Sequence, residues 1–337
     1  MLQKCLVLII VSCCITHSYA QNPVITIVDT SKRVSIRGLS VVDNATIWCS
    51  GNYGSVARSI DGGKTFKWQT IKGYEKYDFR DIEAFDANTA IIMGIAEPAI
   101  ILKTKDGGQT WQKVFEDTTK GMFLDAMAFD RKGNGWVIGD PINNQFYKAF
   151  TKNNGDSWIN LTNIDAAKAL QKGEAFFASS GTNIKINSNK NYPVIFATGG
   201  VASRLFFNDA IYSLPLNKGK ESTGANSIDI WKNKAVVVGG DFANDKDTSG
   251  NCVLISLKKL PVFTKPQAPP NGYRSCVVYV NKNTLVSCGT SGVDISYDGG
   301  NNWQLISTKS FHVVQKAKKG NAIYLAGSGG KIARLEL

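Results

Sequence analysis

Seven residues recur at one position of a repeated unit, and most of them carry a polar side chain. Each lies five residues before Val42, Phe85, Phe129, Ser179, Trp231, Tyr279 or Ala317, and the seven are Arg37, Arg80, Leu124, Glu174, Asn226, Arg274 and His312. The arginines could hold an anionic group, because a planar guanidinium binds a carboxylate or phosphate through two parallel hydrogen bonds. If the units form a ring, these side chains surround one mouth of its central channel.

Carboxylates are expected at the same mouth, on the loops that follow the next strand of each unit. These loops contribute Glu97, Asp140, Arg204 and Asp241, with Asp81 and Asp125 as neighbours. Two carboxylates across an open pocket can hydrolyse a glycosidic bond, and the catalytic candidates are Glu174, Asp140 and Asp241. The candidates for ligand binding are Arg37, Arg80, Arg204, Arg274 and His312. The alternative is that these charges pair with one another between units and that water fills the channel.

The repeat that positions these residues is a turn sequence, Ser/Thr-x-Asp-x-Gly-x-x-aromatic, known as the Asp box. Its four copies begin at Ser59, Thr104, Thr151 and Ser296. The first three are 45 and 47 residues apart, and the fourth follows after 145, close to three periods. We expect a structural role for the acidic or amide residue of each box, because Asp and Asn bond to nearby backbone amides and glycine provides the positive φ of a tight turn. These residues are Asp61, Asp106, Asn153 and Asp298.

A second marker covers the interval in which the Asp box is lost. Seven apolar strands end in glycine: Thr46–Gly51, Ala90–Gly94, Trp136–Gly139, Val194–Gly199, Ala235–Gly239, Leu285–Gly289 and Ile323–Gly327. A period of about 40 to 50 residues with several short strands per unit is typical of propeller blades. The sequence therefore predicts an all-β fold, a seven-bladed β-propeller with Asp-box turns.

The two ends of the chain are expected to close this ring. The last unit stops after its third strand, Lys331–Leu337, and lacks an outer strand. The segment Val24–Val28 is rich in β-branched residues and belongs to no unit of its own. We expect it to supply the missing strand, which removes an exposed sheet edge.

Residues 1–20 have the pattern of a signal peptide. Lys4 precedes an apolar run, Leu6–Val11, and Ser18-Tyr19-Ala20 precedes the expected cleavage before Gln21. The sequence therefore predicts two parts, a signal peptide over 1–20 and one propeller over 21–337, in a secreted or periplasmic protein. A competing interpretation is a lipoprotein cleavage box, Ile10-Val11-Ser12-Cys13, which would attach the chain to the cell envelope at Cys13.

Composition excludes several classes of function. The formal net charge is +12, but the lysines are scattered and form no basic arm, so we expect no nucleic-acid partner and a monomer. No Walker loop, dinucleotide fingerprint or zinc-ligand spacing is present, so no cofactor or metal is expected. Cys276 and Cys288 flank the turn at Asn281–Asn283 and are placed to face each other across two strands, as two thiols or as a disulfide.

The motifs resemble those of a known family. Gly139-Asp140-Pro141, the segment Gly173–Gly181, Thr198-Gly199-Gly200, Gly239-Gly240-Asp241 and Gly272–Ser275, together with the Asp boxes, resemble exported bacterial Asp-box (BNR-like) propellers, which are similar to photosystem II assembly-factor-like proteins. The resemblance covers nearly the whole chain after residue 20 and carries no activity with it. Some members are labelled oxidoreductases, a label that no cofactor motif here supports.

Sialidases also contain Asp boxes, and this chain departs from their pattern. Their first blade has an Arg-Ile-Pro motif, whereas Arg37 is followed by Gly38-Leu39. Two hypotheses follow. The first is a binding or assembly module that recognises a polypeptide or an anionic glycan on the rim opposite the Asp boxes. The second is a glycosidase-like hydrolase that uses the rim carboxylates and arginines.

Overall fold

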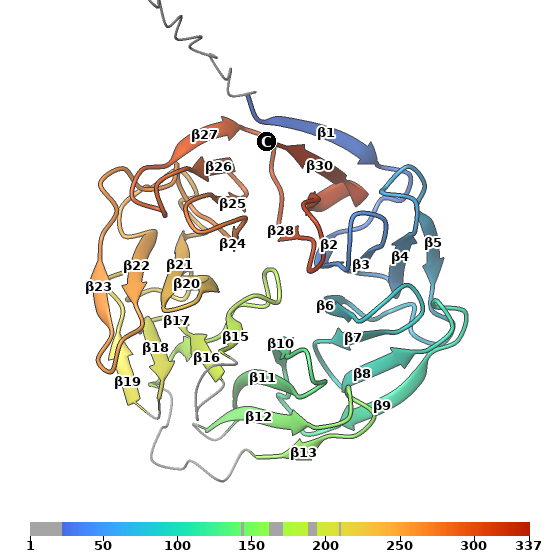
Figure 1. Ribbon diagram of the computed structural model, residues 1–337. Coiled ribbons are helices and arrows are strands. Elements are labelled where there is room, and N and C mark those ends of the chain that lie inside the picture. Colours follow the sequence, from blue (N-terminus) through green and yellow to red (C-terminus); the bar gives the residue numbers. More distant parts are fainter. Residues whose placement is uncertain (1–21, 143–144, 162–170, 188–193, 209) are drawn as a thin grey trace, which may run out of the picture.

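The chain forms a ring of antiparallel sheets around a central axis (Figure 1). The computed structural model describes residues 22–142, 145–161, 171–187, 194–208 and 210–337. Within these ranges there are seven sheets, so the expected seven-bladed all-β propeller is confirmed. The proposed signal peptide and Cys13 lie outside the described residues. None of the described helices is long and apolar enough to cross a membrane.

The first three blades are regular four-stranded sheets, numbered here from the central axis outward. Blade 1 consists of β2 (Ile36–Val41), β3 (Ile47–Gly51), β4 (Ser55–Ser59) and β5 (Lys67–Thr70). Blade 2 consists of β6 (Phe79–Ala84), β7 (Ala90–Gly94), β8 (Ala99–Thr104) and β9 (Gln112–Asp117). Blade 3 consists of β10 (Leu124–Phe129), β11 (Gly135–Ile142), β12 (Gln145–Thr151) and β13 (Ile159–Asn160).

Blades 4 and 5 depart from this regularity. Blade 4 consists of β15 (Ile184–Ile186), β16 (Val194–Ala197), β18 (Arg204–Phe207) and β19 (Ala210–Ser213). Blade 5 consists of β20 (Thr223–Trp231), β21 (Lys234–Asp241), β22 (Cys252–Ser256) and β23 (Val262–Thr264). Two short strands, β14 (Glu174–Ala175) and β17 (Gly199–Gly200), extend the sheet of blade 5 on its inner side.

The last blade is completed by the start of the chain. Blade 6 consists of β24 (Cys276–Tyr279), β25 (Leu285–Gly289), β26 (Gly292–Ser296) and β27 (Gln304–Ser307). Blade 7 consists of β28 (Val313–Lys316), β29 (Ile323–Ala326), β30 (Ile332–Glu336) and, outermost, β1 (Val24–Asp29), with the short 3-10 helix η2 (Ser328–Gly330) between β29 and β30. Strand β1 pairs antiparallel with β30, with Ile25 opposite Leu335, which confirms the predicted closure.

The glycines that end the second strands have a steric reason. A β-carbon added at Gly51, Gly139 or Gly239 would lie 2.4, 2.3 or 1.8 Å from the carbonyl oxygen of Ser35, Phe123 or Gly224. Real β-carbons do not approach a carbonyl so closely, so in these three blades the inner strand can enter only opposite a glycine of the second strand, although β11 and β21 continue beyond that glycine. Packing requires the same repeat, because neighbouring blades share hydrophobic cores. For example, Ile91 and Ile101 of blade 2 pack with Leu124 and Val137 of blade 3.

All four Asp boxes lie on turns between third and fourth strands. In the first box, Asp61 Oδ1 accepts the hydroxyl of Ser59 and the amide of Thr65, and the Ser59 hydroxyl accepts the amide of Gly63. The same pattern recurs around Asp106, Asn153 and Asp298. The bond from the Thr65 hydroxyl is the main cause that lowers the pKa of Asp61 to about 2. The hydrogen bonds of each box lie within its own turn, and they engage the carboxylate or amide of the box.

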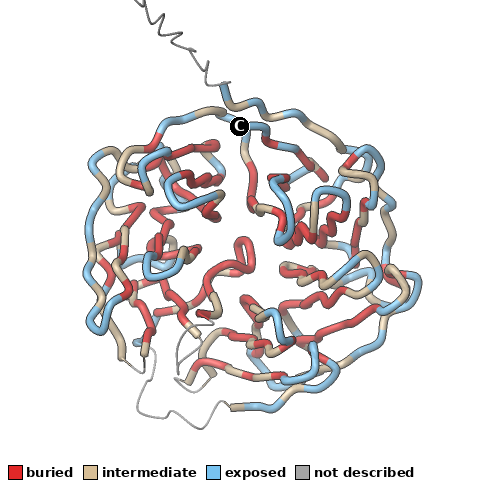
Figure 2. Tube along the Cα trace, viewed as in Figure 1, coloured by how far each residue is buried: buried red, intermediate tan, exposed pale blue. Residues whose placement is uncertain are grey.

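The centre of the ring is occupied by the chain itself. Residues 176–183, the channel loop, run toward the axis from beside β15 and are mostly buried (Figures 1 and 2). Ser179 accepts a bond from Arg37 of blade 1 and donates one to Asn226 of blade 5, at 3.1 and 3.0 Å. The Ser180 hydroxyl donates to the Ser275 carbonyl of blade 6 at 2.7 Å. The expectation of a water-filled channel is therefore wrong for the level of the ring that this loop crosses.

Candidate functional site

One face of the ring carries the expected site residues. Inner strands start on this face and second strands end on it, whereas the Asp boxes lie on the opposite face. We call this face the rim. Four inner strands have a β-bulge at the same place, because one residue is unpaired directly after the residue that lies opposite Gly51, Gly94, Gly139 or Gly239 of the second strand. A bulge redirects the extra side chain, and the bulged residues are Arg37, Arg80, Asp125 and Asn226.

The bulges correct the expected alignment in two blades. In blade 3 the bulged residue is Asp125, and Leu124 is the paired residue before it. In blade 6, Arg274 lies opposite Gly289 as Ile36 lies opposite Gly51, so Ser275 is the counterpart of Arg37. In blade 7 the same comparison makes His312 the counterpart, as expected. The alignment is wrong by one residue in blades 3 and 6, because Phe129 and Tyr279 are the last paired residues of their inner strands and so correspond to Val41 of blade 1, not to Val42.

Glu174 is also misplaced by the alignment. The inner strand of blade 4 is β15, whereas Glu174 lies in β14 and pairs with Gly200. Its carboxylate is buried and binds Arg204 through both oxygens, with Nε–Oε1 at 2.8 Å and Nη2–Oε2 at 2.5 Å. The hydroxyl of Thr198 and the amide of Gln171 also donate to it. Both oxygens are therefore engaged within the protein, an arrangement that holds β14 in place and leaves no atom of Glu174 open to a substrate.

Arg274 does not reach the rim. The side chain is 0% exposed, so the expectation that it binds a ligand there is wrong. Its Nε donates to Asp294 Oδ2 at 2.5 Å, and its other nitrogens donate to Ser291 and to the carbonyls of Tyr273 and Asn271. A buried guanidinium needs this full set of partners. Arg274 therefore stabilises blade 6 from inside.

Arg37 and His312 lie together at the seam of blades 7 and 1. Arg37 donates to the Ser179 carbonyl, and its pKa is lowered by burial and by the nearby charge of Arg80. His312 Nδ1 lies 2.9 Å from the Ile36 carbonyl and Nε2 lies 3.1 Å from the Ser328 hydroxyl. The carbonyl requires the proton on Nδ1, so the ring in its neutral form accepts the Ser328 hydroxyl at Nε2. Burial, with the charge of Arg37, lowers the pKa of His312 to about 4.

Arg80 is the more accessible arginine of the pair. Its Nε donates to Asp78 at 2.8 Å, and its guanidinium lies over the ring of Phe123, 5.9 Å from the centroid. Both members of this ion pair keep about a quarter of their side-chain surface exposed, at 28% and 27%. Arg80 can therefore exchange Asp78 for a ligand at low cost, because a partly exposed pair contributes little to stability.

Three aspartates of blades 2 and 3 lie near the channel loop: Asp81 and Asp125 are buried, and Asp140 is partly buried. Burial raises the pKa of Asp81 to about 8, and burial together with the charge of Asp140 raises the pKa of Asp125 well above its usual range. Burial also raises the pKa of Asp140 to about 6, although its Oδ1 accepts the amide of Phe176 at 3.0 Å. Asp81 accepts the amides of Ile82 and Met127. These side chains join blades 2 and 3 to each other and to the loop.

The remaining expected residues support loops. Asp241 is mostly buried and accepts the amide of Ala243 at 2.9 Å. Its pKa is lowered, first by a bond from Ser222. Glu97 accepts the amide of Gly121 at 2.6 Å and is exposed. Cys276 and Cys288 face each other across β24 and β25, and both are free thiols.

Aromatic side chains at the rim are the feature that sequence reasoning missed. Phe242 follows second strand β21 and is 49% exposed, and its ring meets Phe177 and Tyr273 edge to face. Tyr53 follows second strand β3 and is 63% exposed, with a positive φ of 57°. The signal was available in the sequence, because both residues lie within three positions of the end of an expected glycine-ended strand. Together with Arg37 and Arg80 they form what we call the aromatic–arginine rim.

The comparisons with known proteins agree with this architecture. Residues 21–121 match the family described as photosynthesis system II assembly factor YCF48. Among solved structures, YCF48 bound to D1 peptide has a TM-score of 0.65 at 16% identity and covers 93% of this chain and 96% of its own. The chain is a seven-bladed propeller similar to YCF48, as the sequence motifs indicated.

Other matches show how widely the fold is shared. YCF48 from Cyanidioschyzon merolae has a TM-score of 0.63 at 13% identity, covering 92% of this chain and 98% of its own. The Pan2 WD40 domain of Neurospora crassa has a TM-score of 0.61 at 15% identity, covering 90% and 89%. No curated protein sequence matches the chain. At these identities, the likeness to YCF48 and to a WD40 domain alike establishes the fold, so function must come from the site.

Glu174 is expected to contribute to stability. Glu174→Gln removes the negative charge that binds the mostly buried guanidinium of Arg204 through both oxygens, so we expect the free energy of unfolding to fall by about 3 kcal/mol. Urea denaturation monitored by tryptophan fluorescence measures this change. Glu97→Gln, on the same face but exposed, is the control and should change it by less than about 0.5 kcal/mol. Equal stability of Glu174→Gln and the unmutated protein would contradict the structural role and reopen a catalytic one.

His312 is expected to make stability depend on pH. The unfolded chain protonates this histidine near its usual pKa of 6.5 and the folded protein only near 4. Between these values the unfolded state binds more protons, so the contribution of His312 is full above pH 6.5 and falls as the pH drops toward 4. The difference in unfolding free energy between the unmutated protein and His312→Gln should therefore shrink over this window and stay constant above it. A difference independent of pH would show that His312 is not held neutral.

Proposed function

We propose that this protein is a binding or assembly module that recognises a polypeptide on its aromatic–arginine rim. The rim combines exposed Phe242 and Tyr53 with the accessible guanidinium of Arg80. Tyrosine, phenylalanine and arginine are enriched at protein interfaces, because they bury large areas and still make polar contacts. The opposite face carries the Asp boxes, whose polar groups are used within their own turns.

The observation that carries the proposal is the contrast between acids and aromatic or cationic groups at the rim. Glu174 is held by Arg204, and Asp241 by loop amides. Asp140 lies mostly buried against the channel loop. Phe242 of blade 5, Tyr53 of blade 1 and Arg80 of blade 2 are exposed or partly exposed on the same face of the ring. A partner that offers apolar and anionic groups therefore fits this rim better than a cationic partner does.

The similarity to YCF48 supports a polypeptide as the ligand. The solved YCF48 structure contains a D1 peptide, and that propeller aligns with nearly all of this chain. At 16% identity, the ligand of the present protein must be inferred from its own side chains. We propose the same class of ligand, a polypeptide, and no particular sequence. An anionic glycan would use the same cations and is an outcome of the test below.

The glycosidase hypothesis gains no support from the geometry. A glycosidase needs two carboxylates that face an open pocket. Glu174 is enclosed by Arg204 and Thr198, and the channel loop occupies the space between the blades. Export remains part of the proposal on the strength of the sequence pattern in residues 1–20: we propose that the module acts outside the cytoplasm, in secreted or periplasmic form, or attached to the envelope at Cys13.

Phe242 and Tyr297 provide a matched pair of variants to test which face binds. The two aromatic side chains are 49% and 50% exposed, and they lie on the rim and on an Asp-box turn, respectively. Peptides are first selected on the unmutated protein from a random dodecapeptide display library, and their affinity is then measured by fluorescence anisotropy. We expect Phe242→Ala to weaken binding about tenfold, the effect of losing one central aromatic contact. Tyr297→Ala should leave it unchanged.

Three results would contradict this proposal. One is a loss of affinity with Tyr297→Ala and none with Phe242→Ala, which would place recognition on the Asp-box face. Another is a selection that yields no peptide. The third is binding of sulfated or sialylated glycan arrays in the absence of any peptide binding, which would replace the polypeptide with a glycan. Thermal melts of both variants show whether either effect comes from unfolding.

A further inference from the structure

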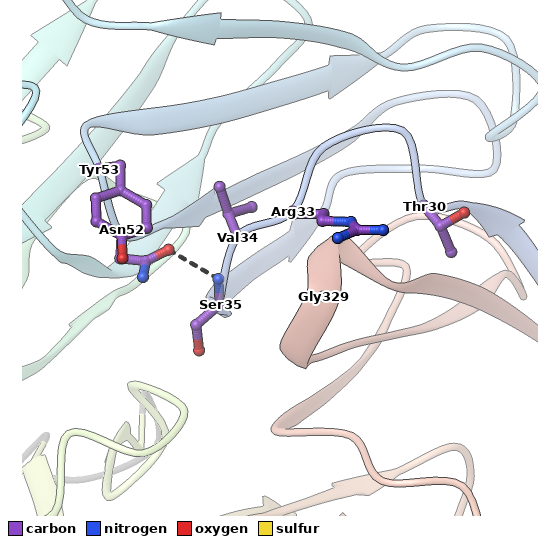
Figure 3. A pocket seen from close by; sticks show the side chains of 7 residues that line it. All are labelled: Thr30, Arg33, Val34, Ser35, Asn52, Tyr53 and Gly329. Atoms are coloured by element: carbon purple, nitrogen blue, oxygen red, sulfur yellow. Dashed lines mark hydrogen bonds between the residues drawn. The ribbon is translucent and has the colours of Figure 1, made fainter.

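A pocket lies on the rim at the seam where the ring closes. Its volume is about 500 Å³, and it is lined by Thr30, Arg33, Val34, Ser35, Asn52, Tyr53 and Gly329 (Figure 3). Residues 30–35 connect β1 of blade 7 to β2 of blade 1, and Gly329 belongs to η2 of blade 7. Asn52 and Tyr53 form the turn after β3 of blade 1. The pocket is therefore built from both sides of the seam.

The walls of the pocket are held in place by backbone bonds. Asn52 Oδ1 accepts the amide of Ser35 at 2.8 Å, which joins the two segments of blade 1 (Figure 3). The amide of Gly330 donates to the carbonyl of Val34 at 2.6 Å, which joins blade 7 to blade 1. A β-carbon at Gly330 would collide with the Lys32 carbonyl, whereas one at Gly329 would meet nothing within 4 Å. The pocket is thus preformed, and Gly329 faces open space.

The charges around the pocket favour an anion. Arg33 is exposed, and no described acidic side chain forms an ion pair with it. The nearest acid in sequence, Asp29, is engaged by the indole of Trp68 and the amide of Ser31. Figure 3 places Arg33 and Thr30 toward one end of the pocket and Tyr53 and Asn52 toward the other. One end therefore offers a guanidinium, and the other an aromatic ring with an amide.

The geometry points to this pocket as the place that binds a carboxylate of the partner polypeptide, either its C-terminus or the side chain of an Asp or Glu. Arg33 pairs with the carboxylate, and Tyr53 packs against the neighbouring apolar side chain of the partner. The volume suits a few residues, not a folded domain. This inference rests on the proposed function and adds the chemical group that is recognised and the place where it binds.

The position of the pocket couples binding to closure of the ring. A ligand that touches Arg33, Tyr53 and the η2 turn binds only when blades 7 and 1 are joined. Whatever binds the closed form and not the open one stabilises closure by mass action. Binding in this pocket therefore raises the thermal stability of the protein as well as holding the partner.

Two substitutions of Gly329 that differ only in one negative charge provide a test of the pocket. Its φ is 74°, a conformation that Asn and Asp both tolerate. Gly329→Asn and Gly329→Asp fill the same space and bear the same backbone strain, but only Asp places a negative charge next to Arg33. Arg33→Gln removes the cation itself. Thermal melts show whether the two Gly329 variants fold equally well.

The probes are four pools of N-acetylated random octapeptides that otherwise contain no Asp or Glu. The first has a free C-terminus and the second is its amide. The third is amidated with one Glu at a fixed position, and the fourth has Gln there. Peptides retained on immobilised protein are quantified by mass spectrometry. We expect the unmutated protein to prefer the first pool over the second, or the third over the fourth, by about fivefold, the strength of one exposed ion pair. Gly329→Asn, which narrows the pocket without adding a charge, should keep a larger preference than Gly329→Asp.

Gly329→Asp and Arg33→Gln should abolish this preference, and the preferred pool should raise the melting temperature of the unmutated protein. An undiminished preference in both variants would overturn the assignment of the pocket. Peptide retention that requires Phe242 but shows no preference for a carboxylate would also overturn it, and would leave the proposed function standing. No retention of any pool by the unmutated protein would contradict both.

Discussion

The pairing of β1 with β30 is the constraint on which the rest of the structure depends. Each blade buries its two faces only against its neighbours, so an open ring would expose the faces of blades 7 and 1 and the edge of β30. The strand Val24–Asp29 covers that edge and carries the chain directly into blade 1 through residues 30–35. The same connection forms one wall of the seam pocket. Closure of the fold and the geometry of the candidate ligand pocket therefore have a common origin.

The channel loop determines where recognition can occur. Its serines and Thr182 bond to blades 1, 5 and 6, and Gly181 packs against Asp81 of blade 2 so closely that a β-carbon would collide with the carboxyl. A propeller with an open channel can bind a ligand along its axis. Here the axis is occupied by buried residues whose serine and threonine side chains bond to the surrounding blades. What remains accessible is the outer part of the rim, where Phe242, Tyr53, Arg33 and Arg80 lie.

Blade number, ring closure and the position of the second strands could be predicted from the sequence, because the Asp box recurs in four blades and glycine-ended apolar segments mark the others. The site could be predicted only in part. Arg37, Arg80 and His312 reach the rim, but Asp125 and Ser275 lie where Leu124 and Arg274 were expected, because Phe129 and Tyr279 correspond to Val41 and not to Val42. The last paired residue of a strand has no marker in a single sequence. Glu174 was misplaced because blade 4 takes its inner strand from Ile184–Ile186, after the channel loop, which no periodic pattern reveals.

The central claim is that the chain closes its own channel and leaves the rim as the recognition surface. Hydrogen–deuterium exchange with mass spectrometry, with and without a selected peptide, tests it most directly. The account predicts that residues 176–183 exchange as slowly as the inner strands even without ligand, and that the peptide protects the segments around Tyr53 and Phe242. Exchange of residues 176–183 within seconds, or protection confined to the Asp-box turns, would contradict it.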